Sequence, residues 1–491
     1  MKSLRYSLLP VLLLGCGGGN GGGGGTPDMA VATLGPAPSL AIACGDKAAD
    51  LYTLPGGLPA MDDSHRGDVF HCAVTESLTA AQLNAEAQAY GYAGPALSSG
   101  AWSYRVAYRT ERVAPSSGSA PEGDTPAVLL VPEKPLAGAP LVVFAHGSVG
   151  IASGCAPSRV DLTTTLSDPS THDFPVNLYT LAGYGYTVIM PDYAGFAYGQ
   201  APGYFVAEDE AHALLDATRA AAKLLPSPPD KVVIVGHSQG GHAALSAHSY
   251  SASYGLQGTL VGVAALAPLW LSLSGFSAAT SPQGGFHTAS DSSTILYSME
   301  YLYSAGELHG GAGHGLDVFQ PAKAQAAKQV ILGGACYETA GLVALGAVPT
   351  DFFDSAFVNQ VGTSCAALPP SLGGDCTQGD APKWLARWKL DRPSINPKGA
   401  PLLVFAGGMD TSVKPGFVQC GRDKINADLM AAGATTMVQY CLDPNATHHS
   451  IVRLQSDYVN QWIAARAGVG SEPAACANVP TTTCTVPPNN F

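Results

Sequence analysis

The residues around Ser238 could supply a nucleophilic hydroxyl. Residues 236–240 read GHSQG, the pattern G-x-S-x-G, and they directly follow the β-branched run Val232–Val235. Ala-rich sequence typical of a helix comes next. A strand, a sharp turn and a helix around this motif hold a serine hydroxyl above the edge of a sheet. We therefore predict that Ser238 is a nucleophile and that the backbone N–H of Gln239, at the helix start, points toward the oxyanion formed on attack.

A serine hydroxyl becomes a good nucleophile beside a base, and that base needs a carboxylate to orient it. In folds with this serine turn, the chain order is nucleophile, acid, histidine. Asp410 follows a predicted strand at Leu402–Ala406, and we predict that it is the acid. His448 and His449 follow the last predicted strand, and two adjacent histidines cannot both face Ser238 from one loop. We favour His448 as the base, with His449 as the alternative.

A second oxyanion donor is expected on the loop after an early strand. Leu141–Ala145 is predicted to be that strand, and His146, Gly147 and Ser148 follow it. We predict that the backbone N–H of Ser148 is this donor, aided by the serine hydroxyl. The chemistry described so far requires no metal ion and no organic cofactor.

Other polar residues are assigned supporting roles. His237 and His242 flank Ser238 and are expected to pack structurally, whereas Asp192 follows an earlier strand and is expected to tie loops together. His309 and His314 are placed in a Gly-rich loop. A zinc site there would need three or four ligands, and the sequence offers no further ones, so we expect no metal site.

The elements that must position these residues alternate between short apolar runs and Ala- and Leu-rich stretches. This alternation indicates an α/β fold with a mainly parallel sheet. The predicted strands are Trp102–Val113, Ala127–Val131, Leu141–Ala145, Thr187–Met190, Val232–Val235, Leu260–Leu266, Leu402–Ala406 and Thr435–Tyr440. Beyond the one that follows Ser238, the predicted helices are Glu208–Leu225, Ser293–Tyr303, Ala322–Leu332 and Leu454–Arg466.

The strand pattern lapses between about residues 269 and 400. We interpret this block as a helical lid that is inserted into the fold and caps the sheet. Its aromatic stretch Tyr297–Tyr303 is a candidate acyl-binding surface or, equally, the core of an ordinary helix.

The N-terminus has the pattern of an export signal. Lys2 and Arg5 precede the short apolar run Leu8–Leu14, which is too short to span a bilayer. Gly15 and Cys16 follow, as in a bacterial lipobox, whose cysteine is lipidated. An ordinary signal peptide with an incidental cysteine is the alternative. We predict a lipoprotein that is anchored at the cell envelope or secreted.

The chain is divided into four predicted regions. A signal peptide with its lipobox occupies residues 1–16, and a Gly- and Pro-rich linker with an irregular start occupies residues 17–60. A hydrolase domain extends over residues 61–470, with the lid inside it, and residues 471–491 form a tail. Glycine-rich linkers are flexible, so this one would let the domain stand off a membrane.

Charge and cysteine content narrow the class of protein further. The net charge of −13 argues against a nucleic-acid partner, because phosphate binding needs clustered Lys and Arg. Eleven cysteines leave an even ten once Cys16 is set aside, which indicates disulfides in an exported chain. The close pairs Cys365/Cys376, Cys420/Cys441 and Cys476/Cys484 are guesses, because sequence does not fix connectivity.

Several stretches resemble the secretory lipase family, which includes the fungal lipase A type. They are HGSVG at residues 146–150, CAPS at 155–158, GYTVIMPDYAG at 185–195 and GHSQGG at 236–241. The resemblance extends from about Ala101 to Gly470, and the CAPS segment is its most diagnostic part. It implies an α/β-hydrolase core with a helical lid, and a disulfide between Cys155 and Cys336. It also places Ser238, Asp410 and a histidine at 448 or 449 in a catalytic triad.

The sequence therefore predicts a serine carboxylic ester hydrolase, a lipase or esterase acting on small-molecule or lipid esters at the cell surface. A peptidase or an acyltransferase with the same triad is the second prediction. A non-catalytic surface-binding lipoprotein is the rival from another class. The sequence specifies no oligomeric state.

Overall fold

The computed structural model of the 491-residue chain describes residues 34–113, 121–163, 173–270, 289–333, 336, 340–365 and 374–476. The predicted signal peptide, Cys16, the Gly-rich tether and Cys484 lie outside the described residues. Leu34–Phe491 form the compact unit that carries every described residue. Among these residues, no helix combines the length and the apolar character needed to cross a bilayer.

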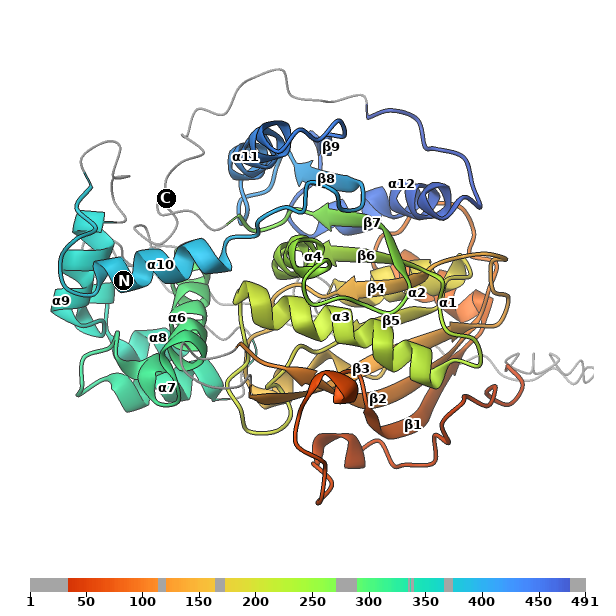
Figure 1. Cartoon of the computed structure of the whole chain (residues 1–491), viewed down its shortest axis with the longest axis horizontal. Coiled ribbons are helices and arrows are strands. Elements are labelled where there is room, and N and C mark those ends of the chain that lie inside the picture. The colour runs from red at the N-terminus through yellow and green to blue at the C-terminus, as the bar shows by residue number, and fades with distance from the viewer. Residues whose placement is uncertain are drawn as a thin grey trace, which may run out of the picture. The chain divides into compact units, whose positions relative to one another are not determined.

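In the described part of the chain, nine strands form one sheet in the order β1-β2-β3-β5-β4-β6-β7-β8-β9 (Figure 1). Pairing is antiparallel from β1 to β5 in this order and parallel from β5 to β9. The strands are β1 Val69–Leu78, β2 Ala101–Glu111, β3 Glu122–Pro132, β4 Leu141–Ala145, β5 Val188–Pro191, β6 Lys231–His237, β7 Thr259–Leu266, β8 Leu402–Gly407 and β9 Gln439–Asp443. The expected mainly parallel α/β fold is therefore confirmed.

The parallel strands deliver their loops to one edge of the sheet. Ala145, the last residue of β4, pairs with Gly236 near the end of β6. In β8 and β9, Gly407 and Asp443 are likewise the last residues and pair with each other. Strands buried on both faces read as continuous apolar runs, which is why the sequence located β4, β6 and β8 well. Ser148, Ser238, Asp410 and the two adjacent histidines all lie on loops that leave this edge.

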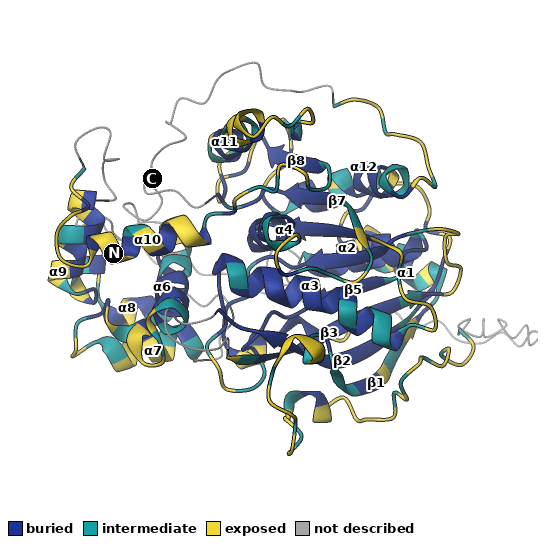
Figure 2. Cartoon of the chain, in the orientation of Figure 1, coloured by how far each residue is buried: buried dark blue, intermediate teal, exposed yellow. Residues whose placement is uncertain are grey.

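Two groups of helices flank the sheet. The first comprises α1 Ala80–Ala89, α2 Phe174–Gly183 and α12 Ser450–Ala467, in which α2 contacts both of the others. The second contains α3 Ala207–Leu224 and α4 Gln239–Tyr250, which pack against each other and are buried along most of their length (Figure 2). Helix α11, Pro415–Ala431, contacts β8.

Two departures from the predicted elements have simple causes. β1 was not predicted, because its burial pattern is irregular and its pairing with β2 shifts register twice. The predicted strand Thr435–Tyr440 is displaced, because Gln439 is the first residue that pairs with β8. The residues before it are β-branched and polar, which imitates a strand in sequence, but they lie outside the sheet.

The expected block of helices occupies the chain between β7 and β8, and Figure 1 shows it grouped at one side of the sheet. It has its own hydrophobic cluster, to which Trp384, Trp388 and Phe353 contribute fully buried rings. Its helices are α6 Ala289–Gly310, α7 Ala324–Leu332, α8 Ala340–Leu345, α9 Ser355–Phe357 and α10 Ala381–Asp391, with a π-helical stretch Val358–Cys365 after α9. We call this block the lid.

The histidines of the lid differ from the prediction. His309 lies in the last turn of α6 and not in a Gly-rich loop, and it pairs with Asp391 at the end of α10 at 2.9 Å. His314 lies on a short 3₁₀ turn and pairs with Asp317 at 2.8 Å. Helix α6 continues past Tyr303, where the sequence pattern ended it, and ends at Gly310, so His309 belongs to the helix.

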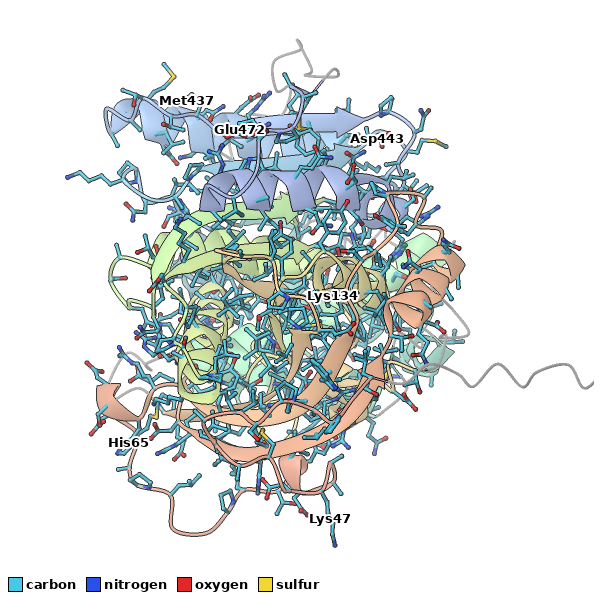
Figure 3. The ribbon with its side chains drawn as sticks, turned by 90° about the vertical axis from the view of Figure 1, so that its right-hand side faces the viewer. Lys47, His65, Lys134, Met437, Asp443 and Glu472 are labelled. Atoms are coloured by element: carbon cyan, nitrogen blue, oxygen red, sulfur yellow. A yellow bond between two sulfur atoms is a disulfide. The ribbon has the colours of Figure 1, made fainter. Side chains whose placement is uncertain are left out.

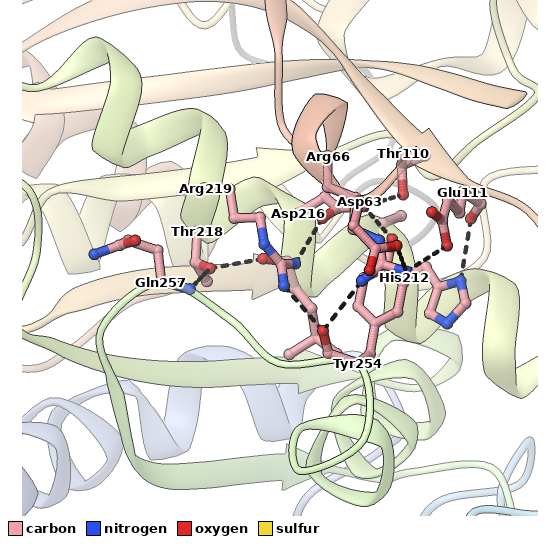
Figure 4. A network of polar contacts seen from close by, with 12 residues as sticks. Asp63, Arg66, Thr110, Glu111, His212, Asp216, Thr218, Arg219, Tyr254 and Gln257 are labelled. Atoms are coloured by element: carbon pink, nitrogen blue, oxygen red, sulfur yellow. Dashed lines mark hydrogen bonds and ion pairs between the residues drawn. The ribbon is translucent and has the colours of Figure 1, made fainter. Parts of the chain in front are cut away.

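A polar network joins β2, α3 and the turn after α4 (Figure 4). Asp216 accepts hydrogen bonds from Thr110 and Tyr254, each at 2.7 Å, and pairs with Arg219. The guanidinium of Arg66 lies 3.9 Å from the ring centre of Tyr254. A buried carboxylate is tolerated when it is paired in this way, so the network anchors α3 to the sheet.

The network and β9 lie at opposite ends of the sheet. Figure 3 shows His65, the neighbour of Arg66 in the chain, together with Lys47 at one end. Met437 and Asp443 lie at the other end, with the strands that carry the loops of interest.

Four disulfides join pairs of described cysteines: Cys44–Cys72, Cys155–Cys336, Cys365–Cys376 and Cys441–Cys476. The second is the pair implied by the family resemblance, and the third is one of the guessed close pairs. The guessed pairs Cys420/Cys441 and Cys476/Cys484 are wrong, because Cys441 bonds to Cys476. Closeness in sequence misled here, since the segment after α12 returns to β9.

Candidate active site

Ser238 occupies a strained turn between β6 and α4. Its backbone has φ 56° and ψ −115°, a region that costs about 1–3 kcal/mol for a residue with a side chain. Close packing of strand and helix enforces the turn. A Cβ added at Gly236 would lie 1.9 Å from the carbonyl oxygen of Gly240, and one at Gly240 would lie 1.9 Å from that of Ala145. Glycine is therefore required at both positions.

His448 lies between Ser238 and Asp410. Its Nε2 is 2.9 Å from the Ser238 Oγ, and its Nδ1 is 2.7 Å from the Asp410 Oδ2. The second carboxylate oxygen, Oδ1, accepts the backbone N–H groups of Ser412 and Val413 at 2.8 Å each. With its Nδ1–H donated to the carboxylate, the imidazole presents the lone pair of Nε2 to the serine hydroxyl.

His449 points away from Ser238. Its Nδ1 is 2.9 Å from the Asp173 Oδ2, and the same oxygen lies 3.1 Å from the Nδ1 of His237. His237 in turn donates its Nε2–H to the carbonyl oxygen of His448 at 2.8 Å. Of the two adjacent histidines, the structure thus brings His448 to Ser238 and places His449 beside Asp173.

The surroundings of His448 favour its neutral form. Burial lowers the pKa of its imidazole, the hydrogen bond to Asp410 opposes this, and the neighbouring His237 lowers the pKa further. The side chain is enclosed, since His448 is 8% exposed and Ser238 is 9% exposed. A base must be unprotonated before it can take a proton, and this environment supplies that state at neutral pH.

Two chain segments that carry the predicted oxyanion donors lie beside Ser238. Gln239 is the first residue of α4, whose N-terminal N–H groups carry a partial positive charge. The loop that carries Ser148 also lies close to Ser238, because a Cβ added at Gly147 would be 3.5 Å from the Cβ of Ser238. The Ser148 hydroxyl is 2.6 Å from the hydroxyl of Tyr204.

The polar residues expected to support the turn have defined partners. His242 places Nδ1 2.7 Å from the buried carboxylate of Glu210, and its Nε2 donates to the carbonyl oxygen of Asp391 at 2.7 Å. This links the helix after Ser238 to the last residue of α10 in the lid. Asp192 accepts the backbone N–H of Ser158 at 2.8 Å and so joins two loops.

The lid helix α6 packs over this region. Tyr297 has its ring centre 6.4 Å from that of Tyr204, whose hydroxyl meets the Ser148 loop. Tyr301 and its neighbour Leu302 are fully buried in the lid core. Most of the stretch Tyr297–Tyr303 is therefore helix core, and Tyr297 is the residue that reaches toward the site.

Sequence reasoning missed Asp173, Glu210 and Tyr204. The first two contact residues of the G-x-S-x-G motif across separations of 64 and 29 residues. Asp173 did carry a local signal, because it precedes Phe174 and Pro175 at the start of a helix. That signal predicts a capping role and gives no hint of the histidines that the carboxylate meets. Among the described residues, no group of three or more His, Cys, Asp or Glu side chains is arranged to hold a metal ion.

Comparison with known proteins agrees with this geometry. Residues 167–270, which include the Ser238 turn, match the model of the secretory lipase family. The match confirms the resemblance expected from the sequence and places the chain among hydrolytic enzymes of the lipase type. No curated protein matches the chain.

Solved structures share the fold across most of the chain. A hydrolase from Legionella pneumophila is 14% identical, with a TM-score of 0.61 over 82% of this chain and 100% of that one. The rice cell wall degrading esterase LipA from Xanthomonas oryzae is 17% identical, with a TM-score of 0.57 over 82% of this chain and 96% of that one. Candida antarctica lipase A in its closed state is 18% identical, with a TM-score of 0.56 over 91% of this chain and 93% of that one. At these identities the likeness establishes the α/β-hydrolase fold.

A buried carboxyl in the lid makes a prediction about stability and pH. Glu300 on α6 is 2% exposed, and its Oε2 has no hydrogen-bond partner among the residues that the structure describes. Burial raises its pKa from 4.5 to about 8, and a backbone hydrogen bond from Ile151 opposes the rise. The unfolded chain loses this proton first, so the side chain destabilises the fold increasingly as pH rises from 4.5 to about 8.

We therefore expect Glu300→Gln to be more heat-stable than the parent, by a margin that grows over this pH range. Thermal unfolding at a series of pH values measures that margin. The exposed Glu133→Gln is the matched control and should show no such trend. A Glu300→Gln margin that is the same at pH 4 and pH 8 would contradict the assignment.

Proposed function

We propose that the protein is a serine carboxylic ester hydrolase that works through an acyl-enzyme. The observation that carries the proposal is the hydrogen-bonded chain from Ser238 through His448 to Asp410, at 2.9 Å and 2.7 Å, on a strained turn. The match to the secretory lipase family supports lipase-type chemistry.

In the first half of the reaction, the Ser238 Oγ attacks the ester carbonyl carbon as its proton passes to the Nε2 of His448. Asp410 stabilises the imidazolium that results. The carbonyl oxygen becomes an oxyanion, which the backbone N–H groups of Gln239 and Ser148 bind. One such donor is worth about 3 kcal/mol of transition-state stabilisation. The imidazolium then protonates the departing alkoxide, and the alcohol leaves the acylated serine.

In the second half, water takes the place of the alcohol. Its proton moves to the Nε2 of His448 as its oxygen attacks the acyl carbonyl carbon. The same two N–H groups bind the second oxyanion. Collapse of this intermediate returns the proton to the Ser238 Oγ and releases the carboxylic acid.

The substrate we propose is a lipid or other acyl ester. The surroundings of the site support this, because Ser238 and His448 are nearly inaccessible and the lid residue Tyr297 lies beside Tyr204, whose hydroxyl bonds to Ser148. A lid that must move aside before substrate enters suits ligands that can displace apolar surface.

The test compares p-nitrophenyl esters of short and long acyl chains with matched amides, for the parent, Ser238→Ala and Ser246→Ala. We expect ester hydrolysis by the parent, and a loss of at least about 10⁴-fold in kcat for Ser238→Ala. Ser246 lies on the same helix and bonds to the His242 carbonyl, so its alanine variant is the control that should keep activity.

Other outcomes would replace the proposal. Preference for amides would indicate a peptidase, and acyl transfer to an added alcohol in preference to water would indicate an acyltransferase. A parent chain inactive on every ester would indicate a binding lipoprotein. Full ester hydrolysis by Ser238→Ala would remove the mechanism.

We also propose where the enzyme works. The disulfides and the family match indicate export. Cys16, after its short apolar run, is proposed to be lipidated and to anchor the domain at the cell envelope through the Gly-rich tether.

Expression of the full chain in a bacterial host with and without Cys16→Ala tests the anchor. We expect the parent in the membrane fraction and the variant in the soluble fraction or the medium, because the lipid is the attachment. Equal distribution of the two chains between fractions would contradict anchoring through this residue.

A further inference from the structure

The carboxylate of Asp173 contacts two histidines and does not cap the helix that follows it. Asp173 is the residue before α2, the position where an aspartate side chain usually accepts a backbone N–H of the first turn. Such a cap stabilises a helix, yet the Asp173 side chain makes no cap hydrogen bond. Its Oδ2 instead lies 2.9 Å from the His449 Nδ1 and 3.1 Å from the His237 Nδ1. The carboxylate therefore joins two histidines, and the helix lacks the stabilisation that a cap would give.

His237 connects this carboxylate to the backbone beside the base. Its Nε2 faces the carbonyl oxygen of His448 at 2.8 Å, and a carbonyl oxygen only accepts, so this nitrogen carries a proton. Its Nδ1 faces Asp173, so a second proton there completes an ion pair. Burial alone would lower the pKa of His237, but the charge of Asp173, the contact with its carboxylate and the backbone of His448 together outweigh burial and raise the pKa. The carboxylate at 3.1 Å therefore favours the charged form of the His237 imidazole.

We propose that Asp173 is a positioning residue for the base. It holds the imidazole of His237 against the backbone of His448 and the imidazole of His449 away from Ser238, so that one histidine of the adjacent pair faces the nucleophile. The inference rests on the proposed ester hydrolase function. It assigns a role to the second histidine of the pair, which the triad alone leaves without one.

The arrangement also acts on the charge of the base. The His237 and His448 ring centres are 4.8 Å apart, and the His448 and His449 centres are 5.2 Å apart. After burial and the opposing bond to Asp410, repulsion from His237 and then from His449 lowers the pKa of His448. The titratable groups around it are thus Asp410 after β8, His237 at the end of β6, and His449 on its own loop. Tyr297 on α6 lies close enough to Asp173 to be affected by its charge.

Asp173→Asn tests the proposal, because it keeps the shape and removes the charge. Without the carboxylate, His237 loses the partner that keeps it protonated. Its repulsion of His448 weakens, and the acidic limb of the kcat/KM profile should move to higher pH. The base loop also loses its fixed position, so we expect kcat to fall about 10- to 100-fold while KM changes less. Asp173→Glu restores the charge and should return the acidic limb toward its original pH.

Asp68→Asn is the matched control. Asp68 likewise bridges a histidine and a second side chain, His65 at 2.7 Å and Lys223. His65 lies at the end of the sheet opposite Asp443 and the base loop (Figure 3). This variant should lose a similar ion pair yet keep the kcat and the pH profile of the parent. Comparison of the two variants separates a loss of thermal stability, which both should show, from an effect on the base, which only Asp173→Asn should show.

His449→Asn is a second test of the proposal. The His449 side chain is 44% exposed, so this substitution should not prevent folding. It should also move the acidic limb of the kcat/KM profile to higher pH. An Asp173→Asn enzyme that loses only thermal stability, like the control, with its kcat and acidic limb unchanged, would overturn the proposal. An unmoved limb in His449→Asn would do the same if Asp173→Asn failed to fold. A parent without esterase activity is a separate result and counts against the proposed function.

Discussion

The close contact of β6 with α4 is the constraint on which the rest of the site depends. The carbonyl oxygens of Gly240 and Ala145 fill the places where side chains would stand at Gly236 and Gly240. This contact leaves the intervening Ser238 no ordinary backbone conformation, and it adopts φ 56°. The strain of one residue is carried by the packing of a whole strand and a whole helix. In return, a hydroxyl is held in one place beside a helix N-terminus.

Everything else at the site is brought to that fixed hydroxyl by parallel strands. Because parallel strands end at the same edge, loops separated by hundreds of residues meet there. The loop after β8 orients Asp410 through two backbone N–H groups, and the loop after β9 places His448 between that carboxylate and Ser238. The lid packs beside this region, where Tyr297 lies near Tyr204, and Asp391, the last residue of α10, is tied to the helix that begins beside Ser238. The position of the hydroxyl, the orientation of the imidazole and the attachment of the lid are thus set by three separate parts of the fold.

The sequence predicted those parts of the fold whose local pattern reflects their environment. Val232–Val235 and Leu402–Ala406 are apolar throughout because both faces of the strand are covered, so the strands and the residues after them were located correctly. β1 escaped prediction because it is partly exposed and irregularly paired. The disulfide that joins Cys72 of β1 to Cys44 was not predicted either. The pattern of apolar and polar residues does not predict a strand whose exposure to solvent varies irregularly along its length.

Tertiary contacts set the limit for the site itself. The rule of chain order predicted Ser238, Asp410 and a histidine as one set because it reflects the topology of the sheet, and the structure brings Ser238, His448 and Asp410 within hydrogen-bond distance. Asp173 could not be found in this way, since its partner His449 lies 276 residues further on and its local sequence suggests a helix cap. The choice between the two adjacent histidines depends on that same long-range contact. The part of the site that sequence left open is therefore the part that Asp173 decides.

The central claim is that the fold makes one serine among many nucleophilic. The most direct measurement is reaction of the intact chain with a fluorophosphonate, followed by mass spectrometry of its peptides. A reactive serine beside a neutral imidazole should capture one equivalent of the probe, located on Ser238, and heat denaturation before labelling should abolish the reaction. A folded chain that stays unlabelled, or that carries the probe on a different residue, would contradict the account.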